Sequence, residues 1–456
     1  MSTMSVASSS ARQESKLVRN LGYWDLMGIA IGQIIGAGIM SMTGIAIGMT
    51  GTGIVLAFLI SAVLTLITIA PVAYLSAAVP TTGGAYRYTS RLLGKKCGFV
   101  FLVLFLITNC TLALYALTFA SYWVSIWAGD QQLIAIAMLV VFYLVNLFGT
   151  KSAAVINTII CVIMVGGIML FIGFGIPQVD FEYIFESSNF FHGGAFGFIA
   201  SLALLSFASS GAQFIAEVGG ETQNPGKTIP KVMVISTLGV AALYALMACV
   251  AVGVLPIEAT ANQPLTAVAN KILPTGIFYL FIPCSAMGAS ASTMNSMLSW
   301  VSKAFLVACE DGLLPKSLAT VSKRGVPYKI LTIFFLVGLL PLLAGWDISF
   351  VSRIGISASL TSKLLVCIAF TKIYLKYPLQ MEQSVLKISE PATKILGISA
   401  GILSVSMGAS LILSLPTWAI ISFTAIVLLA ILYANVALKS VSIPDDLVVV
   451  YNDGKK

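Results

Sequence analysis

Long apolar runs follow one another along nearly the whole chain and constrain the fold more than any other feature. A bilayer core takes a helix of about 20 apolar residues. Twelve runs of roughly that length or longer lie between charged or turn-rich breaks, so the sequence predicts twelve membrane-spanning helices. They cover residues 22–49, 53–78, 98–128, 132–149, 153–176, 194–219, 230–254, 275–308, 329–346, 348–374, 393–414 and 417–438. Only Gly149-Thr150-Lys151 clearly separates the fourth run from the fifth.

The composition excludes a water-soluble domain. Only 9% of the 456 residues are charged and the mean hydropathy is +1.00, whereas soluble domains carry roughly 25% charged residues. The same numbers exclude fibrous, disordered and disulfide-rich secreted chains. The first residues, through about Asn20, are polar and lack the apolar core of a removable signal peptide. The predicted fold class is all-α integral membrane, with no separate soluble domain.

Basic residues alternate between the two sides of the predicted membrane. With the N-terminus inside, 22 of the 25 Lys and Arg residues lie in cytoplasmic segments. Lys271 lies in an outer loop, and Arg353 and Lys363 fall inside a span. Because basic residues accumulate on the cytoplasmic side, we expect a multi-pass protein of a bacterial cytoplasmic membrane with both termini in the cytoplasm. The net charge of +8 then reflects topology and attraction to membrane lipid, not nucleic-acid binding.

The seven cysteines indicate neither a metal site nor a cofactor. They lie in or beside apolar spans, and no two have the spacing of a metal-binding pair: Cys97, Cys110, Cys161, Cys249, Cys284, Cys309 and Cys367. We expect them to be small buried hydrophobic residues. No catalytic grouping of the kind that would suggest a membrane-embedded enzyme is present either.

Two spans contain small residues that predict an interrupted helix. In the first span, Gly36 and Gly38 are two residues apart and so do not share a helix face. In the sixth, small and hydroxyl-bearing residues occupy 207–213. Unwound backbone is tolerated at membrane depth only where it lines a cavity or binds something. Close packing of helices through small residues is the alternative explanation of the glycines.

Breaks five spans apart predict two inverted repeats, an arrangement common in secondary transporters. The repeats would cover about 22–176 and 194–374, giving a 5+5 inverted repeat with discontinuous helices 1 and 6. Residues 393–438 would be accessory helices. The whole transporter domain would cover 22–438, between cytoplasmic tails 1–21 and 439–456.

Four motifs resemble those of the amino acid–polyamine–organocation transporters. Ile35-Gly36-Ala37-Gly38-Ile39, after a Tyr-Trp-Asp entry, is similar to the family's first-span motif. Pro80-x2-Gly83-Gly84-Ala85-Tyr86, Glu221-Thr-Gln-Asn224-Pro225 and Glu310-Asp311-Gly312-Leu313-Leu314-Pro315 follow in family order. The resemblance covers the twelve-span chain and weakens after the ninth span.

The resemblance implies that a substrate amino acid lies between the two breaks. A helix beginning after Gly38 would offer free N–H groups and a positive dipole end to a carboxylate. The carbonyls of Ile34 and Ile35, together with those of residues 207–210, would accept hydrogen bonds from the ammonium group. Such a site holds the backbone of an α-amino acid. The resulting substrate set includes Ile34, Ile35, Gly36, Ala37, Gly38, Phe207, Ala208, Ser209 and Ser210.

The closest resemblance is to the arginine/agmatine antiporter branch. Counted from Asn224-Pro225, Phe207 falls at an aromatic gate, Ser210 at a backbone contact and Gln213 at a coupling glutamate. Asn109 falls at a substrate-contacting asparagine, and Met297 of the eighth span joins the substrate set. Core packing is the alternative role for Phe207, and a bond to a neighbouring helix is the alternative for Asn109.

Two positions depart from the family pattern. Ala37 replaces a hydroxyl residue, which removes one hydrogen-bond donor for a carboxylate. This favours amine substrates, or a site in which backbone groups alone bind the substrate. Met164 lies at the position where other members of the family have a lysine whose charge takes the place of a bound sodium ion. The antiporter branch also lacks that lysine, so Met164 favours exchange.

Three ionisable residues lie well inside predicted spans, and such residues are functional candidates because they are costly there. Glu217 and Lys363 could pair as a structural bridge, or take part in gating and coupling. Arg353 could bind a carboxylate or extend to the outer interface.

The sequence thus predicts a secondary transporter of amino acids or related amines, working by alternating access as an exchanger. A proton-coupled uptake permease, using Glu217 or Lys363, is the alternative. Ala37 favours amines, Arg353 favours acidic ligands, and Ser209 and Ser210 favour neutral amino acids, so the substrate stays open. The oligomeric state is not indicated.

Overall fold

The computed structural model describes residues 19–439, 441–443 and 447, and the side chains of Ala37, Ser41, Ser187 and Ser410 are outside this description. The predicted tails at 1–21 and 439–456 fall largely outside the described residues. Within the described ranges, all regular structure is helical. Two isolated bridges, Leu21 to Thr222 and Thr82 to Val218, join loop segments.

The described part of the chain contains ten helices long and apolar enough to cross a membrane. This is a multi-pass membrane protein. The uninterrupted long helices are α3 (Ile54–Ala78), α8 (Thr150–Gly175), α12 (Pro225–Val254), α19 (Ile348–Thr371), α22 (Glu390–Leu413) and α23 (Thr417–Val436). Two shorter apolar helices, α7 (Gln131–Leu147) and α18 (Tyr328–Leu343), coincide with the predicted fourth and ninth spans. The count of twelve spans stays a prediction.

Interrupted helices account for the other predicted spans. They consist of α1 (Tyr23–Ile34) and α2 (Ala37–Thr50), α5 (Lys95–Thr108) and α6 (Thr111–Val124), α11 (Gly194–Ala208) and the 3-10 helix η3 (Ala212–Glu217), and the series α15 (Thr275–Phe281), η5 (Ile282–Met287), α16 (Gly288–Trp300) and α17 (Ser302–Glu310). The breaks in the first and sixth spans lie within the predicted segments, but α2 begins at Ala37 with Gly36 as its N-cap, so the prediction that this helix begins after Gly38 was wrong. The break at Asn109-Cys110 was not predicted, nor was η5, a π-helical turn that contains Pro283. Proline lacks the N–H that a regular helix needs, which explains the irregular turn.

Short elements connect these helices. They are η1 (Gly51–Gly53), α4 (Gly84–Leu93), η2 (Ile176–Gln178), α9 (Phe181–Phe185), α10 (Ser187–Phe190), η4 (Gly219–Glu221), α13 (Ile257–Thr260), α14 (Thr266–Ile272), η6 (Lys316–Leu318), α20 (Ile373–Lys376) and α21 (Pro378–Glu382).

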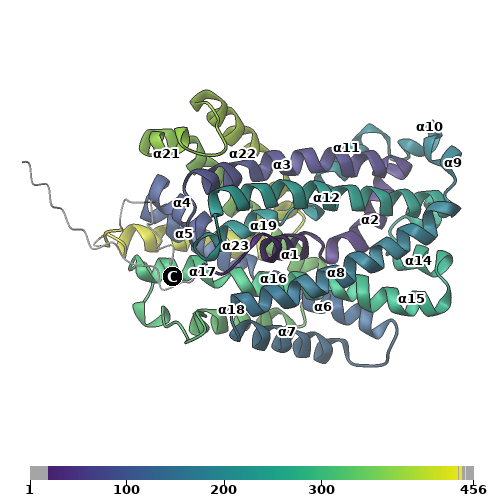
Figure 1. Ribbon diagram of the computed structural model, residues 1–456, viewed down its shortest axis with the longest axis horizontal. Helices are drawn as coiled ribbons and strands as arrows, with labels where there is room; N and C mark the ends of the chain where they lie inside the picture. Colours follow the sequence, from purple (N-terminus) through teal and green to yellow (C-terminus); the bar gives the residue numbers. More distant parts are fainter. Residues whose placement is uncertain (1–18, 440, 444–446, 448–456) are drawn as a thin grey trace, which may run out of the picture.

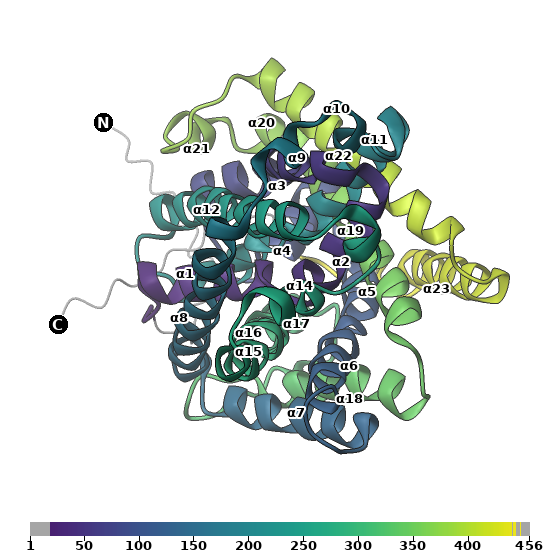
Figure 2. The same ribbon diagram turned by 90° about the vertical axis from the view of Figure 1, so that its right-hand side faces the viewer.

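The long helices run side by side in one bundle (Figure 1). We call the end that carries α4, α17 and α21 the terminal face, because the described chain ends lie there, and the end with α9, α10 and α14 the opposite face. Figure 2 looks onto the opposite face, where α2 and α16 lie nearer the middle, α1 lies to the left beside α8 and α12, and α23 lies at the right-hand edge. Helix α1 packs against α8, α12 and α16. The interrupted segments are therefore interior, where unwound backbone can be shielded from lipid.

Candidate functional site

The first interruption separates α1 from α2 at Ile35 and Gly36. Its carbonyls accept hydrogen bonds from neighbouring helices. The Thr293 hydroxyl of α16 donates to the Gly32 carbonyl at 2.7 Å, and its single hydrogen is also within reach of the Ile35 carbonyl at 3.2 Å and the Ala289 carbonyl of its own helix at 3.0 Å. The Tyr244 hydroxyl of α12 donates to the Ile34 carbonyl at 3.2 Å. An ammonium group at Ile34 or Ile35 would therefore share carbonyls that already have protein donors.

The second interruption separates α11 from η3 at residues 209–211. The Ser210 hydroxyl donates to the Phe207 carbonyl of its own segment at 2.9 Å. The Ser209 hydroxyl is buried and has no hydrogen-bond partner among the described residues. Gly211 has φ 144°, a conformation that residues other than glycine rarely adopt. This chain reversal therefore depends on glycine.

The two interruptions touch each other. A Cβ at Gly211 would lie 2.7 Å from the carbonyl oxygen of Gln33, which is on α1. Both interruptions also face one cavity of about 720 Å³, into which Gly36, Gly38, Phe207 and Ser210 project backbone or side chain. The lining of the cavity extends to the start of α7 and to the loop between α18 and α19, so the cavity is open toward the opposite face.

A smaller cavity of about 60 Å³ continues inward from the first. The two share Gln33, Tyr115, Phe207 and Ser210 in their linings. Beyond Phe207, the lining of the small cavity is contributed largely by α5, α6, α16 and α19. Its residues from this side include Thr108, Thr111, Met297, Ser359 and Lys363. Phe207 thus lies at the junction of the two cavities.

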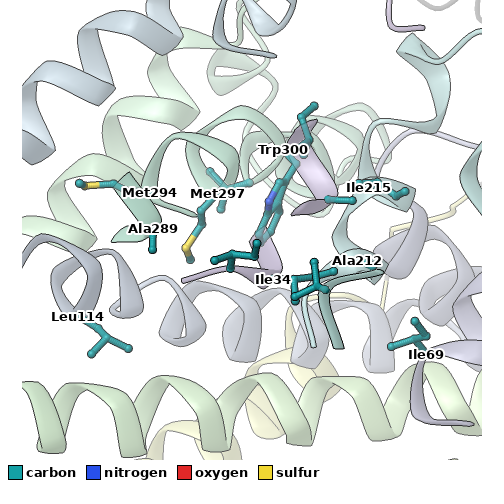
Figure 3. Packing of buried hydrophobic residues seen from close by; sticks show 14 of the residues in the cluster. Ile34, Ile69, Leu114, Ala212, Ile215, Ala289, Met294, Met297 and Trp300 are labelled. Atoms are coloured by element: carbon teal, nitrogen blue, oxygen red, sulfur yellow. The ribbon is translucent and has the colours of Figure 1, made fainter. Parts of the chain in front are cut away.

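Aromatic rings close the small cavity on the terminal side. The Phe214 and Trp300 rings are stacked, with centroids 4.2 Å apart and an interplanar angle of 3°. The Trp300 Nε1–H donates to Gln33 Oε1 at 3.1 Å. Figure 3 shows Trp300 and Met297 with Ile34 in this packed interior. The floor therefore joins α1, η3 and α16.

Ion pairs lie between this floor and the terminal face. The Lys303 amine of α17 lies 2.5 Å from Glu221 Oε1, and both side chains are buried. Lys151 of α8 pairs with Asp25 of α1 at 2.5 Å. These contacts join segments that the distribution of basic residues predicts to lie on one side of the membrane.

A second buried cluster lies nearby. Arg91 binds Asp311 through two nitrogens, at 2.6 and 2.8 Å. The Tyr86 hydroxyl donates to Asp311 at 2.8 Å. Burial, and then the Asp311 charge, raise the pKa of Tyr86, which keeps its phenol protonated as a donor. Arg91, Asp311 and Tyr86 therefore hold α4 against the end of α17.

The structure brings most of the predicted substrate residues together. Residues that line the larger cavity are Ile34, Gly36, Gly38, Phe207, Ala208 and Ser210; Met297, Gln213 and Lys363 line the smaller one. Ile35, Ser209 and Asn109 line neither. Asn109 is buried at the break after α5, and its amide donates to the Phe105 carbonyl at 2.7 Å. The side chain of Ala37 is outside the description, so its missing hydroxyl stays a sequence argument.

The structure separates the three predicted ionisable residues. Glu217 accepts a hydrogen bond from the Ala85 N–H at 3.1 Å, and its other oxygen has no partner among the described residues. Lys363 donates to the Thr68 hydroxyl at 3.2 Å. The alternative of a structural bridge between Glu217 and Lys363 is therefore not present. Arg353 donates to the Ser414 carbonyl at 2.8 Å and lines neither cavity.

Sequence reasoning missed several residues of the site. Gln33 and Tyr115 line both cavities, and Trp300 forms the floor. Gln33 could have been noticed, because an amide directly before the first break is unusual in an apolar run. Nothing local marks Tyr115 or Trp300, since aromatic residues are common in membrane helices.

Interrupted helices around a cavity within a membrane bundle define a transport protein of the broken-helix class. Residues 21–442 match the amino acid permease family. The chain belongs to this family and is a membrane transporter, not an enzyme, as the sequence motifs predicted.

Curated relatives agree with this assignment. An uncharacterised transporter of Mycobacterium tuberculosis is 30% identical over 325 residues, which cover 69% of this chain and 71% of that protein. A branched-chain amino acid permease of Bacillus subtilis is 27% identical over 348 residues, covering 71% and 74%. A D-serine/D-alanine/glycine transporter of Escherichia coli is 24% identical over 348 residues, covering 72% and 73%.

Proposed function

We propose that this protein moves neutral amino acids across the membrane by alternating access, as an exchanger. The observation that carries the proposal is the pair of helix interruptions facing one cavity, open on one side and closed on the other. The start of α2 offers N–H groups to a carboxylate where Gly36 and Gly38 line the cavity. The transported compounds named for two relatives, branched-chain amino acids and D-serine, D-alanine or glycine, support neutral substrates.

For the substrate to reach the terminal face, contacts on the terminal side of the site must separate. Lys303 with Glu221 and Lys151 with Asp25 each join one interrupted span, or the loop after it, to α17 or α8. In the proposed cycle, the first, second, sixth and seventh spans rock against the remaining helices, Phe207 occludes the substrate, and these ion pairs open. We place the terminal face in the cytoplasm because of its basic residues. The described cavity then opens outward.

The first experiment is efflux from proteoliposomes preloaded with labelled amino acids or amines. The external medium is tested with and without unlabelled substrate. For an exchanger, we expect efflux that requires an external partner, and the effective partners identify the substrate class. Efflux of amines but of no neutral amino acid would contradict the proposed substrate.

Proton-coupled uptake is a second candidate, and the structure provides a specific reason for it. Glu217 is buried with one oxygen unpartnered among the described residues, and its other oxygen accepts the Ala85 N–H in the first turn of α4. Such a carboxylate could carry a proton when its surroundings change. Efflux without a partner, driven by an imposed pH gradient and lost in Glu217→Gln, would favour this candidate. Partner-dependent efflux that Glu217→Gln leaves intact would reject it.

A further inference from the structure

Lys363 places a positive charge beside the predicted substrate position. It lies on α19 and lines the small cavity, which continues from the larger one through Gln33, Tyr115, Phe207 and Ser210. Its amine donates to the Thr68 hydroxyl of α3, which in turn donates to the Thr65 carbonyl at 2.9 Å. Two of the three amine hydrogens are therefore not used by these contacts.

No carboxylate neutralises this charge within the described residues. Lys363 forms no ion pair in the described part of the chain. Asp347 is the one other charged residue in the linings of the two cavities. It lies at the mouth, where its carboxylate caps α19 by accepting the Phe350 N–H at 2.9 Å. Glu217 lines neither cavity, and Arg353 is bound to Ser414.

The unpaired charge of the Lys363 amine should act strongly on charged groups of a substrate in the cavity. In a protein interior the effective dielectric constant is about 20 instead of 80, so charges of like sign repel more than in water. A substrate held at the interruptions with its side chain toward Phe207 would bring that side chain close to the amine. A cationic side chain would be repelled, while a neutral one, or one with an oxygen acceptor, would be accommodated.

We propose that Lys363 is a specificity-determining residue that excludes substrates with a second positive charge, such as basic amino acids and diamines. The inference rests on the proposed function, because it assumes that amino acids occupy the cavity. It also opposes the expectation from Ala37 that amines are favoured. Lysine and norleucine test it best, because they differ in the terminal charge and have similar length.

The test measures how unlabelled norleucine and lysine inhibit the uptake of labelled alanine into proteoliposomes that are preloaded with unlabelled alanine, which supplies the internal partner that an exchanger needs. In the wild type we expect lysine to inhibit at least 100-fold more weakly than norleucine. Lys363→Met should reduce this ratio at least tenfold, mainly because lysine becomes a stronger inhibitor. Lys363→Arg keeps the charge and should keep the ratio.

Two controls separate charge from structure. Thr68→Val removes the contact between α3 and α19 but keeps the amine, so the ratio should not change. Lys372→Met removes an exposed charge after the end of the same helix and should also leave the ratio unchanged. If Thr68→Val changes the ratio of inhibition by norleucine and lysine as much as Lys363→Met does, the proposal is overturned. The hydrogen bond between Lys363 and Thr68 would then determine selectivity, and not the charge.

The wild type alone can also contradict the inference. Equal inhibition by lysine and norleucine would overturn it even if Lys363→Met does not fold. Absence of any alanine uptake or exchange would instead contradict the proposed function. In that case, thermal stabilisation of the purified protein by norleucine but not by lysine would still support the role of Lys363, and equal stabilisation by both would reject it.

Discussion

The two helix interruptions meet at one cavity but are held in different ways. At the first, hydroxyls of Thr293 and Tyr244 reach in from two other helices and bind the freed carbonyls. At the second, Ser210 bonds within its own segment and the Ser209 hydroxyl has no partner among the described residues, while the Thr65 hydroxyl of α3 donates to the Ser206 carbonyl just before the break at 3.0 Å. The first interruption is thus fixed at the break itself by two neighbouring helices, whereas residues 209–211 of the second depend mainly on their own chain reversal.

This difference suggests a division of roles. Carbonyls fixed by two helices form a preorganised surface, which binds a ligand with less loss of freedom. A segment with few outside hydrogen bonds can change shape at lower cost. We therefore expect the first interruption to hold the constant part of a substrate and the second to adjust during transport. Four substitutions test this comparison.

The largest effect is expected at Gly211, where the second interruption depends on backbone geometry. Gly211→Ala would place a Cβ at φ 144° and 2.7 Å from the Gln33 carbonyl. Strain and the clash together should lower the free energy of unfolding by about 3 kcal/mol or more. The matched control is Gly239→Ala in α12, where a Cβ meets nothing within 4 Å. Thermal unfolding of both variants in detergent measures the difference, and equal melting temperatures would show that the second interruption is not fixed by its chain reversal.

The next effect is expected at Gly38, which lines the cavity beside the first interruption. A Cβ there would meet Met42 and Ala208 at 3.4 to 3.6 Å, which is ordinary contact, so Gly38→Ala should fold and bind. Gly38→Leu should fold as well but fill the space where backbone meets ligand. We expect it to weaken substrate binding at least 100-fold, measured as loss of ligand-induced thermal stabilisation. Wild-type affinity in Gly38→Leu would reject the proposed substrate position.

A smaller effect is expected at Thr293, which ties α16 to the first interruption. Thr293→Val preserves the shape of the side chain but removes the donor to the Gly32 and Ile35 carbonyls. Unsatisfied buried carbonyls cost about 1–3 kcal/mol, so the variant should be less stable by that amount. Thr293→Ser keeps the hydroxyl and serves as the control. Equal stability of all three proteins would mean that the first interruption does not depend on its neighbours.

Sequence reasoning located both interruptions but not what holds them. Gly36 and Gly38 are visible because two glycines two residues apart do not share one helix face, which predicts an interruption. The partners of the freed carbonyls are not visible, since Thr293 and Tyr244 lie more than two hundred residues away in the chain. Six of the predicted substrate residues line the larger cavity because they are adjacent to the interruptions in sequence.

Positions that depended on side-chain direction were harder to infer. Arg353 and Lys363 lie on the same helix, and the sequence offered both as candidate charges within the membrane. The structure directs Lys363 into the small cavity and Arg353 toward the end of α22. Successive residues lie about 100° apart around a helix, so Arg353 and Lys363 point in directions about 80° apart, and the sequence does not show which of these directions faces the cavity.

The smallest effect on stability is expected at Ser209, and it distinguishes the two interruptions most sharply. Because its buried hydroxyl has no partner among the described residues, Ser209→Ala should leave the free energy of unfolding within about 0.5 kcal/mol of wild type or raise it slightly. If the second interruption adjusts around the substrate, this hydroxyl finds a partner only in another state of the cycle. Exchange should then slow several-fold while equilibrium binding in the described state changes little. The measurement pairs exchange rates in proteoliposomes with ligand-induced stabilisation, using Thr293→Ser for comparison. A loss of stability of the size expected for Thr293→Val would show that both interruptions are held by hydrogen bonds, and the distinction between them would fail.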